Sequence, residues 1–121
     1  MLIDSNLIIY AAQPEHAALR EFISTYAPLV SAVSYVEVLG YHNLSDSQAE
    51  SLQRFFAATT MLPIDQDVLD QAVRLRQQHK MSLGDALIAA AAVVHRLTLA
   101  THNVSDFDWI DGLAIIDPLA G

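Results

Sequence analysis

Four carboxylates in this sequence stand at positions where metal chemistry is a better explanation than solubility. Asp4 ends the apolar stretch "LID", Asp106 lies in the polar stretch "THNVSDF", and Glu37 and Asp85 have apolar neighbours without a Lys or Arg at helical spacing. An unpaired carboxylate in apolar surroundings is costly to keep ionised, and several together are worse unless a cation joins them. Oxygen-only ligands favour a hard cation such as Mg²⁺, which can polarise a phosphodiester and activate a water molecule.

Asp85 also has a purely structural explanation. Ser82 and Asp85 have the S-x-x-[DE] spacing of a capping box, although Glu or Gln is the usual fourth residue. A carboxylate in the first turn of a helix is also stabilised by the helix dipole, by roughly 0.3–1 kcal/mol. On this stretch alone, a helix start explains Asp85 somewhat better than a metal ligand does.

The elements that must position these residues alternate between short apolar stretches and helical patterns. We expect strands at residues 2–4, 29–31, 61–64, 97–101 and 113–116, and helices at residues 15–26, 34–41, 45–58 and 65–79 and in the apolar stretch headed by Asp85. Strands that alternate with helices predict a parallel sheet covered on both faces. Ligands bind such sheets beyond the carboxyl ends of the strands. Asp4 and the loop at 101–106 both follow predicted strands, so we expect them at one edge.

Length and composition limit the classes of protein to consider. The chain has 121 residues, of which 53% are hydrophobic and 17% charged, which predicts one globular domain over residues 1–121. It has no cysteine, which excludes disulfides and thiolate metal sites and fits a reducing cytosol. No segment approaches the roughly 20 apolar residues of a membrane span, and the N-terminus lacks the pattern of a signal peptide. We therefore expect a cytoplasmic protein that does not enter a membrane.

The net charge of −8 argues against strong non-specific binding to nucleic acid, which depends on Lys and Arg. It is compatible with metal binding, with a basic protein partner or with plain solubility. Arg74, Arg76 and Lys80 form the one local basic patch, just before Asp85. These three residues are candidates for an RNA contact, although a solvated helix face explains them at least as well.

Four stretches of the chain resemble the PIN-domain nucleases and, within them, the VapC-type toxins of toxin–antitoxin modules. The matching stretches are "LIDSNLII", "VSAVSYVEVLGY", "LGDALIAAAA" and "LATHNVSDF". Each alone is weak, but together they cover nearly the whole chain in the order of the family. The resemblance implies an α/β fold, a single PIN-like domain with a short parallel sheet flanked by helices. It also implies a metal-dependent endoribonuclease that hydrolyses RNA with Mg²⁺ or Mn²⁺.

The same resemblance gives the candidate site residues. Asp4 would be the metal ligand after the first strand, Glu37 the second carboxylate and Asp85 the third. Asp85 would then serve both at the helix start and at the metal, because a helix start faces the same edge as the strand ends. The fourth position is open between Asn103, an amide that can ligate only weakly or through water, and Asp106, which would supply the remaining charge.

Other residues of the motifs would support this site. Ser5 and Asn6 would support Asp4 from the turn after the first strand, and Thr101 and Asn103 would orient water or phosphate. Ser31 and Ser34 match small hydroxyl positions before the Glu of the family, and we interpret both mainly as helix caps. A haloacid-dehalogenase-like phosphatase also begins with a strand that ends in Asp, but it needs a second Asp where Asn6 stands.

The resemblance also implies partners. A VapB-type antitoxin would insert an Arg toward the carboxylates, which suits a negatively charged site, and the apolar composition leaves room for the interface of a homodimer. The alternative is a PIN-like metal-binding or protein-interaction module without nuclease turnover. Asn103 and the low basic content favour that alternative. Metal binding together with RNA cleavage would distinguish the two functions.

Overall fold

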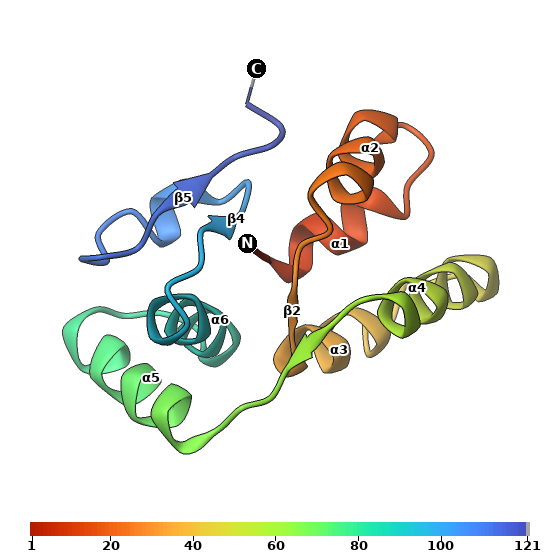
Figure 1. Cartoon of the computed structure of the whole chain (residues 1–121). Coiled ribbons are helices and arrows are strands. Elements are labelled where there is room, and N and C mark those ends of the chain that lie inside the picture. The colour runs from red at the N-terminus through yellow and green to blue at the C-terminus, as the bar shows by residue number, and fades with distance from the viewer. Residues whose placement is uncertain (121) are drawn as a thin grey trace.

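The computed structural model of the chain describes residues 1–120 and consists of short parallel strands between helices (Figure 1). The strands are β1 (Leu2–Ile3), β2 (Val30–Ser31), β3 (Met61–Leu62), β4 (Leu99–Ala100) and β5 (Ile115–Ile116). The helices are α1 (Ser5–Ala11), α2 (Ala17–Tyr26), α3 (Ala32–Leu39), α4 (Asp46–Ala58), α5 (Gln66–Gln78) and α6 (Leu83–Val94), with a 3₁₀ turn, η1 (Val104–Asp106). This confirms the predicted α/β class with a short parallel sheet flanked by helices.

All paired strands run parallel. Strands β1, β4 and β5 form one sheet in that order, and β2 pairs with β3 in a second. A parallel bridge between Leu2 and Leu29 joins the two sheets, because the amide of Ile3 donates to the carbonyl of Leu29. The strands therefore lie in the order β3–β2–β1–β4–β5. Their carboxyl ends meet at one edge, as the alternation of strands and helices predicts.

Successive residues of each strand point to opposite faces and build two hydrophobic cores. Leu2 and Leu99 contribute to a core with α5, α6 and the segment after β4, whereas Ile3 and Ala100 contribute to a core with α1 to α4. Helix α6 lies deepest in the first core, because five of its 12 residues are buried alanines that let it pack closely on the sheet. Both faces of the sheet are thus covered.

Helix α1 is absent from the sequence-based prediction, which treated Ser5 and Asn6 as a turn. Its stretch "SNLIIYA" is nearly all apolar, so it lacks the alternation of polar and apolar residues that identifies a surface helix. Helix α3 begins two residues earlier than predicted, with Ser31 as its N-cap. Strand β3 ends before Pro63, which cannot donate to a sheet. The remaining helices and strands that differ from the prediction are shorter than predicted, by one or two residues at an end.

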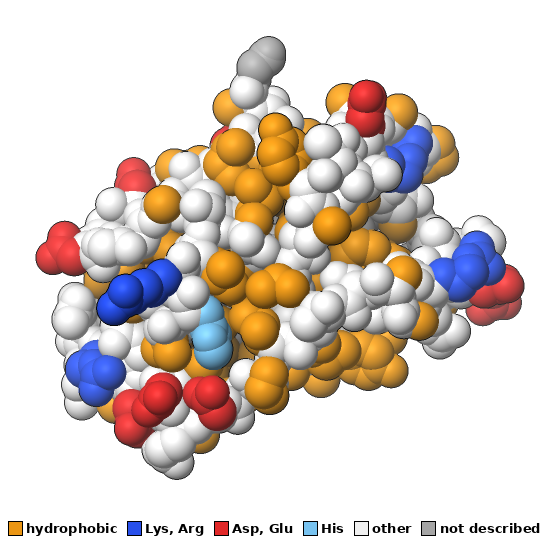
Figure 2. Space-filling model, viewed as in Figure 1, with side chains coloured by type: hydrophobic (Ala, Val, Ile, Leu, Met, Phe, Trp, Pro, Cys, Tyr) orange, Lys and Arg blue, Asp and Glu red, His pale blue; other side chains and the backbone are white. Residues whose placement is uncertain are grey.

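The surface leaves several large hydrophobic side chains exposed. On the face in Figure 2 they spread over the region of β2 and α3, with charged side chains toward the periphery. Val36, on α3, is 71% exposed, and the others are Tyr26, Tyr35, Tyr41, Met61, Ile64, Leu69, Val73, Leu83 and Ile116. Within residues 1–120, no helix combines the length and the apolar character that a membrane crossing requires.

Candidate active site

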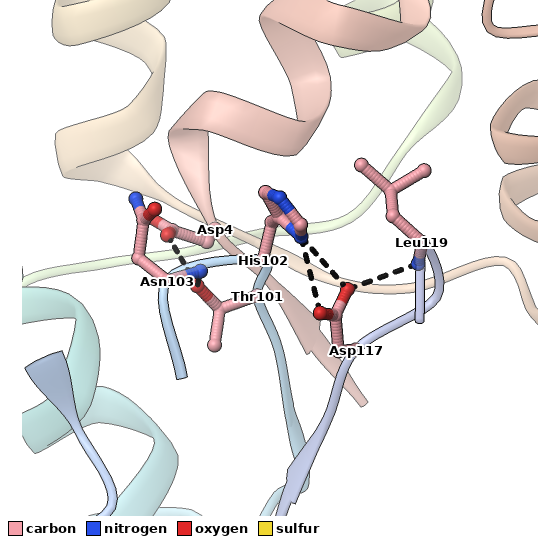
Figure 3. Close-up of polar contacts among 6 residues, drawn as sticks. All are labelled: Asp4, Thr101, His102, Asn103, Asp117 and Leu119. Carbon is pink, nitrogen blue, oxygen red and sulfur yellow. Dashed lines mark hydrogen bonds and ion pairs between the residues drawn. The ribbon is translucent and has the colours of Figure 1, made fainter. Parts of the chain in front are cut away.

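Asp4 lies at the carboxyl end of β1 and is only 3% exposed. Its amide donates to the carbonyl of Ala100 at 2.9 Å, which fixes its backbone to the neighbouring strand. The Thr101 hydroxyl, which is fully buried at the end of β4, donates to Asp4 Oδ2 at 2.8 Å and accepts from the amide of Asn103 at 3.1 Å (Figure 3). Thr101 is therefore placed to orient Asp4 directly.

Glu37, in the last turn of α3, is held by two serines. The Ser5 hydroxyl donates to Glu37 Oε1 at 2.8 Å, and the hydroxyls of Ser5 and Ser34 lie 2.8 Å apart. Because a serine hydroxyl has one hydrogen, Ser34 must donate to Ser5 while Ser5 donates to Glu37. The Ser5 hydroxyl thus supports Glu37, and the Ser5 backbone amide bonds to the carboxylate of Asp4, the residue that the sequence-based prediction expected Ser5 to support.

The carboxylate of Glu37 also lies against the first turn of α6. A Cβ added to Gly84 would lie 2.9 Å from Glu37 Cδ and closer still to Glu37 Oε2. Real Cβ atoms do not approach other heavy atoms this closely, so a side chain at this position would displace the carboxylate. Gly84 therefore allows Glu37 to approach the residue that follows it, Asp85.

Asp85 lies in the first turn of α6, with Ser82 as the N-cap. The Ser82 hydroxyl accepts from the Asp85 amide at 3.1 Å, so the predicted helix start is confirmed, with Ser82 as its cap. The pKa of the Asp85 carboxyl is raised above its ordinary value, chiefly by partial burial. The charge of Asp106 raises the pKa further, and the charge of Glu37 makes a smaller contribution in the same direction. Hydrogen bonding with Ser82 acts against these effects and lowers the pKa.

The pKa of Asp4 is raised from 3.8 to about 6. Burial is the largest cause; the hydrogen bond from Thr101 lowers the pKa, while the charges of Asp85 and Glu37 raise it. Each of the four predicted carboxylates therefore takes part in a repulsion that shifts a pKa. Within residues 1–120, the ion pairs join Arg54 to Glu50 and His102 to Asp117, and none involves these four.

The donors at this edge suit a divalent cation, although no three His, Asp or Glu side chains among residues 1–120 converge as a ready ligand cluster. Mg²⁺ is usually held by one or two protein carboxylates, with water and phosphate oxygens in its remaining positions. A buried carboxylate with a raised pKa, repelled by its neighbours and lacking a basic partner, is the kind of group that a cation would stabilise. The residues present therefore fit such an ion.

The remaining predicted residues lie around this edge or away from it. Asn6 is exposed on α1, and Asn103 is half-buried after β4. Arg74 bonds to the Gln71 side chain on α5, while Arg76 donates to the carbonyl of Met81 at 3.3 Å. Arg76 and Lys80 line a cavity of about 780 Å³ between α5 and α6, together with apolar residues of both helices. The basic patch therefore adjoins the start of α6 and does not contact the carboxylates.

The sequence-based prediction missed three features of this edge. Gly84 acts on Glu37 from a position that is far away in the sequence, and Ser34 acts on it only through Ser5. The third is an ion pair beside Thr101, where His102 Nδ1 lies 3.1 Å from Asp117 Oδ2, and Asp117 Oδ1 accepts from the amide of Leu119 (Figure 3). This pair ties the end of β4 to the chain after β5. The sequence showed only that His102 lies in the candidate loop.

Known proteins resemble this chain in sequence and in fold. The family model of the PIN domain matches residues 1–113. Ribonuclease VapC10 of Mycobacterium tuberculosis strain H37Rv is 31% identical, over 93% of this chain and 90% of its own length. Among solved structures, a toxin–antitoxin complex from Klebsiella pneumoniae is similar with a TM-score of 0.75 and 28% identity, covering 97% of this chain and 96% of that one. DNA-bound VapBC from Salmonella typhimurium has a TM-score of 0.83 at 19% identity, covering 97% and 96%, which shows the shared fold.

Proposed function

Because the chain belongs to the PIN-domain family, among its VapC-type ribonucleases, we propose that it is a metal-dependent endoribonuclease that acts as the toxin of a type II toxin–antitoxin pair. One observation carries the proposal. Burial raises the pKa of Asp4 and of Asp85 at the edge where parallel sheets bind ligands, and the charges of Glu37 and Asp106 lie close enough to add to these increases; within residues 1–120 none of the four pairs with a Lys or Arg. A divalent cation would relieve that repulsion and allow a substrate phosphate to approach.

We assign Asp4, Glu37, Asp85 and Asp106 as the residues that would hold Mg²⁺ or Mn²⁺. When bound, such an ion would polarise the phosphodiester and lower the pKa of a water molecule. Asp106 is preferred to Asn103 at the fourth position, because its charge acts on Asp85 and an amide carries no charge.

The other residues of the site orient these carboxylates. Thr101 fixes Asp4 by a hydrogen bond to Oδ2. Ser34 and Ser5 form a chain of hydrogen bonds that ends on Glu37 Oε1. Orientation by buried hydroxyls keeps these side chains from swinging toward solvent, which preserves a geometry that a substrate phosphate can complete. Arg76 and Lys80 would contact the RNA beyond the scissile phosphate.

The partners follow from the same assignment. The complexes solved for similar proteins are toxin–antitoxin complexes, and we propose that a VapB-type antitoxin binds this chain and directs a basic side chain to the carboxylates, where charge-assisted bonds are strong. We also propose a homodimer through the exposed hydrophobic side chains of α3 and α5, among them Val36, Leu69 and Val73.

Cleavage of a mixed pool of tRNA and rRNA by the purified protein tests the proposal. Reactions would contain Mn²⁺, Mg²⁺ or EDTA, with the Asp4→Asn variant in parallel. We expect cleavage that requires the metal and is lost in the variant. Two inert proteins, of which the wild type still binds Mn²⁺, would instead favour the metal-binding module without turnover, once other RNAs and co-purified antitoxin have been tested.

A further inference from the structure

The segment after β4 carries Asp106 on a compact turn that Trp109 closes. The amide of Asp106 donates to the carbonyl of Asn103 at 3.0 Å, and Trp109 Nε1 donates to the carbonyl of Asp106 at 3.0 Å. On the inner side, Phe107 is fully buried in the core with α6. The turn is therefore anchored on its inner side by Phe107, and its outer side depends on what holds Trp109.

Trp109 stacks on His79. The two ring centroids lie 4.6 Å apart and the ring planes differ by 15°. His79 is the C-cap of α5, and its Nδ1 bonds to the carbonyl of Lys80 at 2.9 Å. Three residues later, Ser82 caps α6 and holds the amide of Asp85. The stack thus joins the turn that carries Asp106 to the connection that leads directly into Asp85.

We infer that His79 and Trp109 are positioning residues, whose stack keeps Asp106 beside the start of α6, where Asp85 and Asp106 would share a divalent cation. The inference rests on the proposed function and deepens it, because it explains how the fourth carboxylate is kept at the site. Neither aromatic ring need touch the metal or the RNA for this effect.

Repulsion between the two carboxylates makes such a restraint necessary. The charge of Asp106 acts on Asp85, and within residues 1–120 no Lys or Arg forms an ion pair with either. The backbone hydrogen bonds from the amides of Asp106, Phe107 and Asp108 all lie within the turn, so they shape it but do not tie its outer side to the neighbouring helices. The stack and the Nε1–H bond are side-chain contacts that oppose movement on the outer side of the turn.

Trp109 is the only tryptophan of the chain, so its fluorescence reports on this turn directly. The experiment is a titration of the full-length protein with Mn²⁺, a paramagnetic quencher, followed through Trp109 emission. Three variants keep the fluorophore: His79→Ala removes the stack, His79→Phe restores an aromatic ring, and Tyr26→Ala removes a distant aromatic pair. Tyr26 pairs with Phe22 on α2 at 4.8 Å and serves as the matched control for a loss of packing.

We expect His79→Ala to weaken Mn²⁺ binding by about two- to tenfold, which corresponds to the usual strength of an aromatic pair. The His79→Phe and Tyr26→Ala variants should bind Mn²⁺ as the wild type does, at a temperature where unfolding curves show every variant folded. Equal affinity in wild type and His79→Ala would overturn the inference and leave the proposed function intact, as would an equal loss in His79→Phe. A wild-type protein that neither binds Mn²⁺ nor cleaves RNA would overturn both.

Discussion

Replacing Asp4 with Asn should stabilise the protein at neutral pH while it abolishes cleavage. Asp4 is nearly fully buried, and its pKa is raised from 3.8 to about 6, chiefly by burial. A shift of this size means that the ionised form costs the folded state about 3 kcal/mol relative to the unfolded chain. Asn has nearly the same shape, never ionises and still offers an oxygen to the Thr101 hydroxyl.

The sign of the effect follows from where each state releases its proton. Below pH 3.8 the Asp4 carboxyl is protonated in both states, so it causes no penalty. Between pH 3.8 and about 6 the unfolded chain ionises first, and the folded state becomes relatively less stable as the pH rises. Above pH 6 the penalty is complete. The difference in the free energy of unfolding between Asp4→Asn and the wild type should therefore increase from pH 3.8 to about 6 and remain constant above that pH.

Urea unfolding of both proteins in EDTA, at several pH values from roughly 4 to 8, measures this difference. The other titrating groups are common to both proteins and largely cancel in the difference. We expect the free energy of unfolding of the variant to gain up to about 3 kcal/mol on the wild type across the series. A difference that stays constant with pH, or one that favours the wild type as the pH rises, would refute a buried Asp4 with a raised pKa.

Saturating Mn²⁺ should then reverse the order of stability. A ligand that binds only the folded state at 100 times its Kd adds about 2.7 kcal/mol, and the variant lacks one charge of the proposed site. The wild type should therefore gain more from Mn²⁺ than Asp4→Asn does. An equal gain in both proteins would show that the ion binds elsewhere.

The edge of the sheet could be predicted from the sequence because it depends on local patterns. Strands that end just before Asp4 and Thr101 must end at the same edge if both run parallel in one sheet, and the structure adds that they are neighbours. The cap of α6 could be predicted in the same way, because Ser82 and Asp85 are three residues apart. In these cases the information lies within a few residues.

The supports of Glu37 could not be predicted, because they depend on how three helices pack. Ser5 reaches Glu37 across 32 residues of sequence, and Ser5 meets Ser34 across 29. Gly84 contributes only by lacking a side chain where α6 passes the carboxylate. Helix α1 itself was missed, since a nearly uniform apolar stretch shows no helical periodicity, and this concealed the position of Ser5.

Further variants test single contacts. Gly84→Ala should lower kcat/KM at least tenfold, because the new methyl group displaces Glu37. The melting temperature should change little, because the preference of a helix for Ala over Gly, about 1 kcal/mol, offsets the cost of moving Glu37. Ser5→Ala removes the hydroxyl that orients Glu37 and should reduce kcat more than KM in steady-state assays. Ala27→Gly, at a φ of 44°, should stabilise the protein by roughly 1 kcal/mol without changing cleavage. Val36→Glu should convert a dimer to a monomer in size-exclusion chromatography.

The net negative charge of the chain opposes the binding of RNA, which is itself negatively charged. Several of its basic side chains are used elsewhere, as Arg20 binds the carbonyls of Ala11, Gln13 and Pro14, and Arg54 pairs with Glu50. The negative charge of the carboxylates also excludes phosphate from the site until a cation neutralises it. On the proposed function, metal and RNA must therefore bind cooperatively. Because such coupling is reciprocal, RNA should raise the affinity for Mn²⁺ by the factor by which Mn²⁺ raises the affinity for RNA.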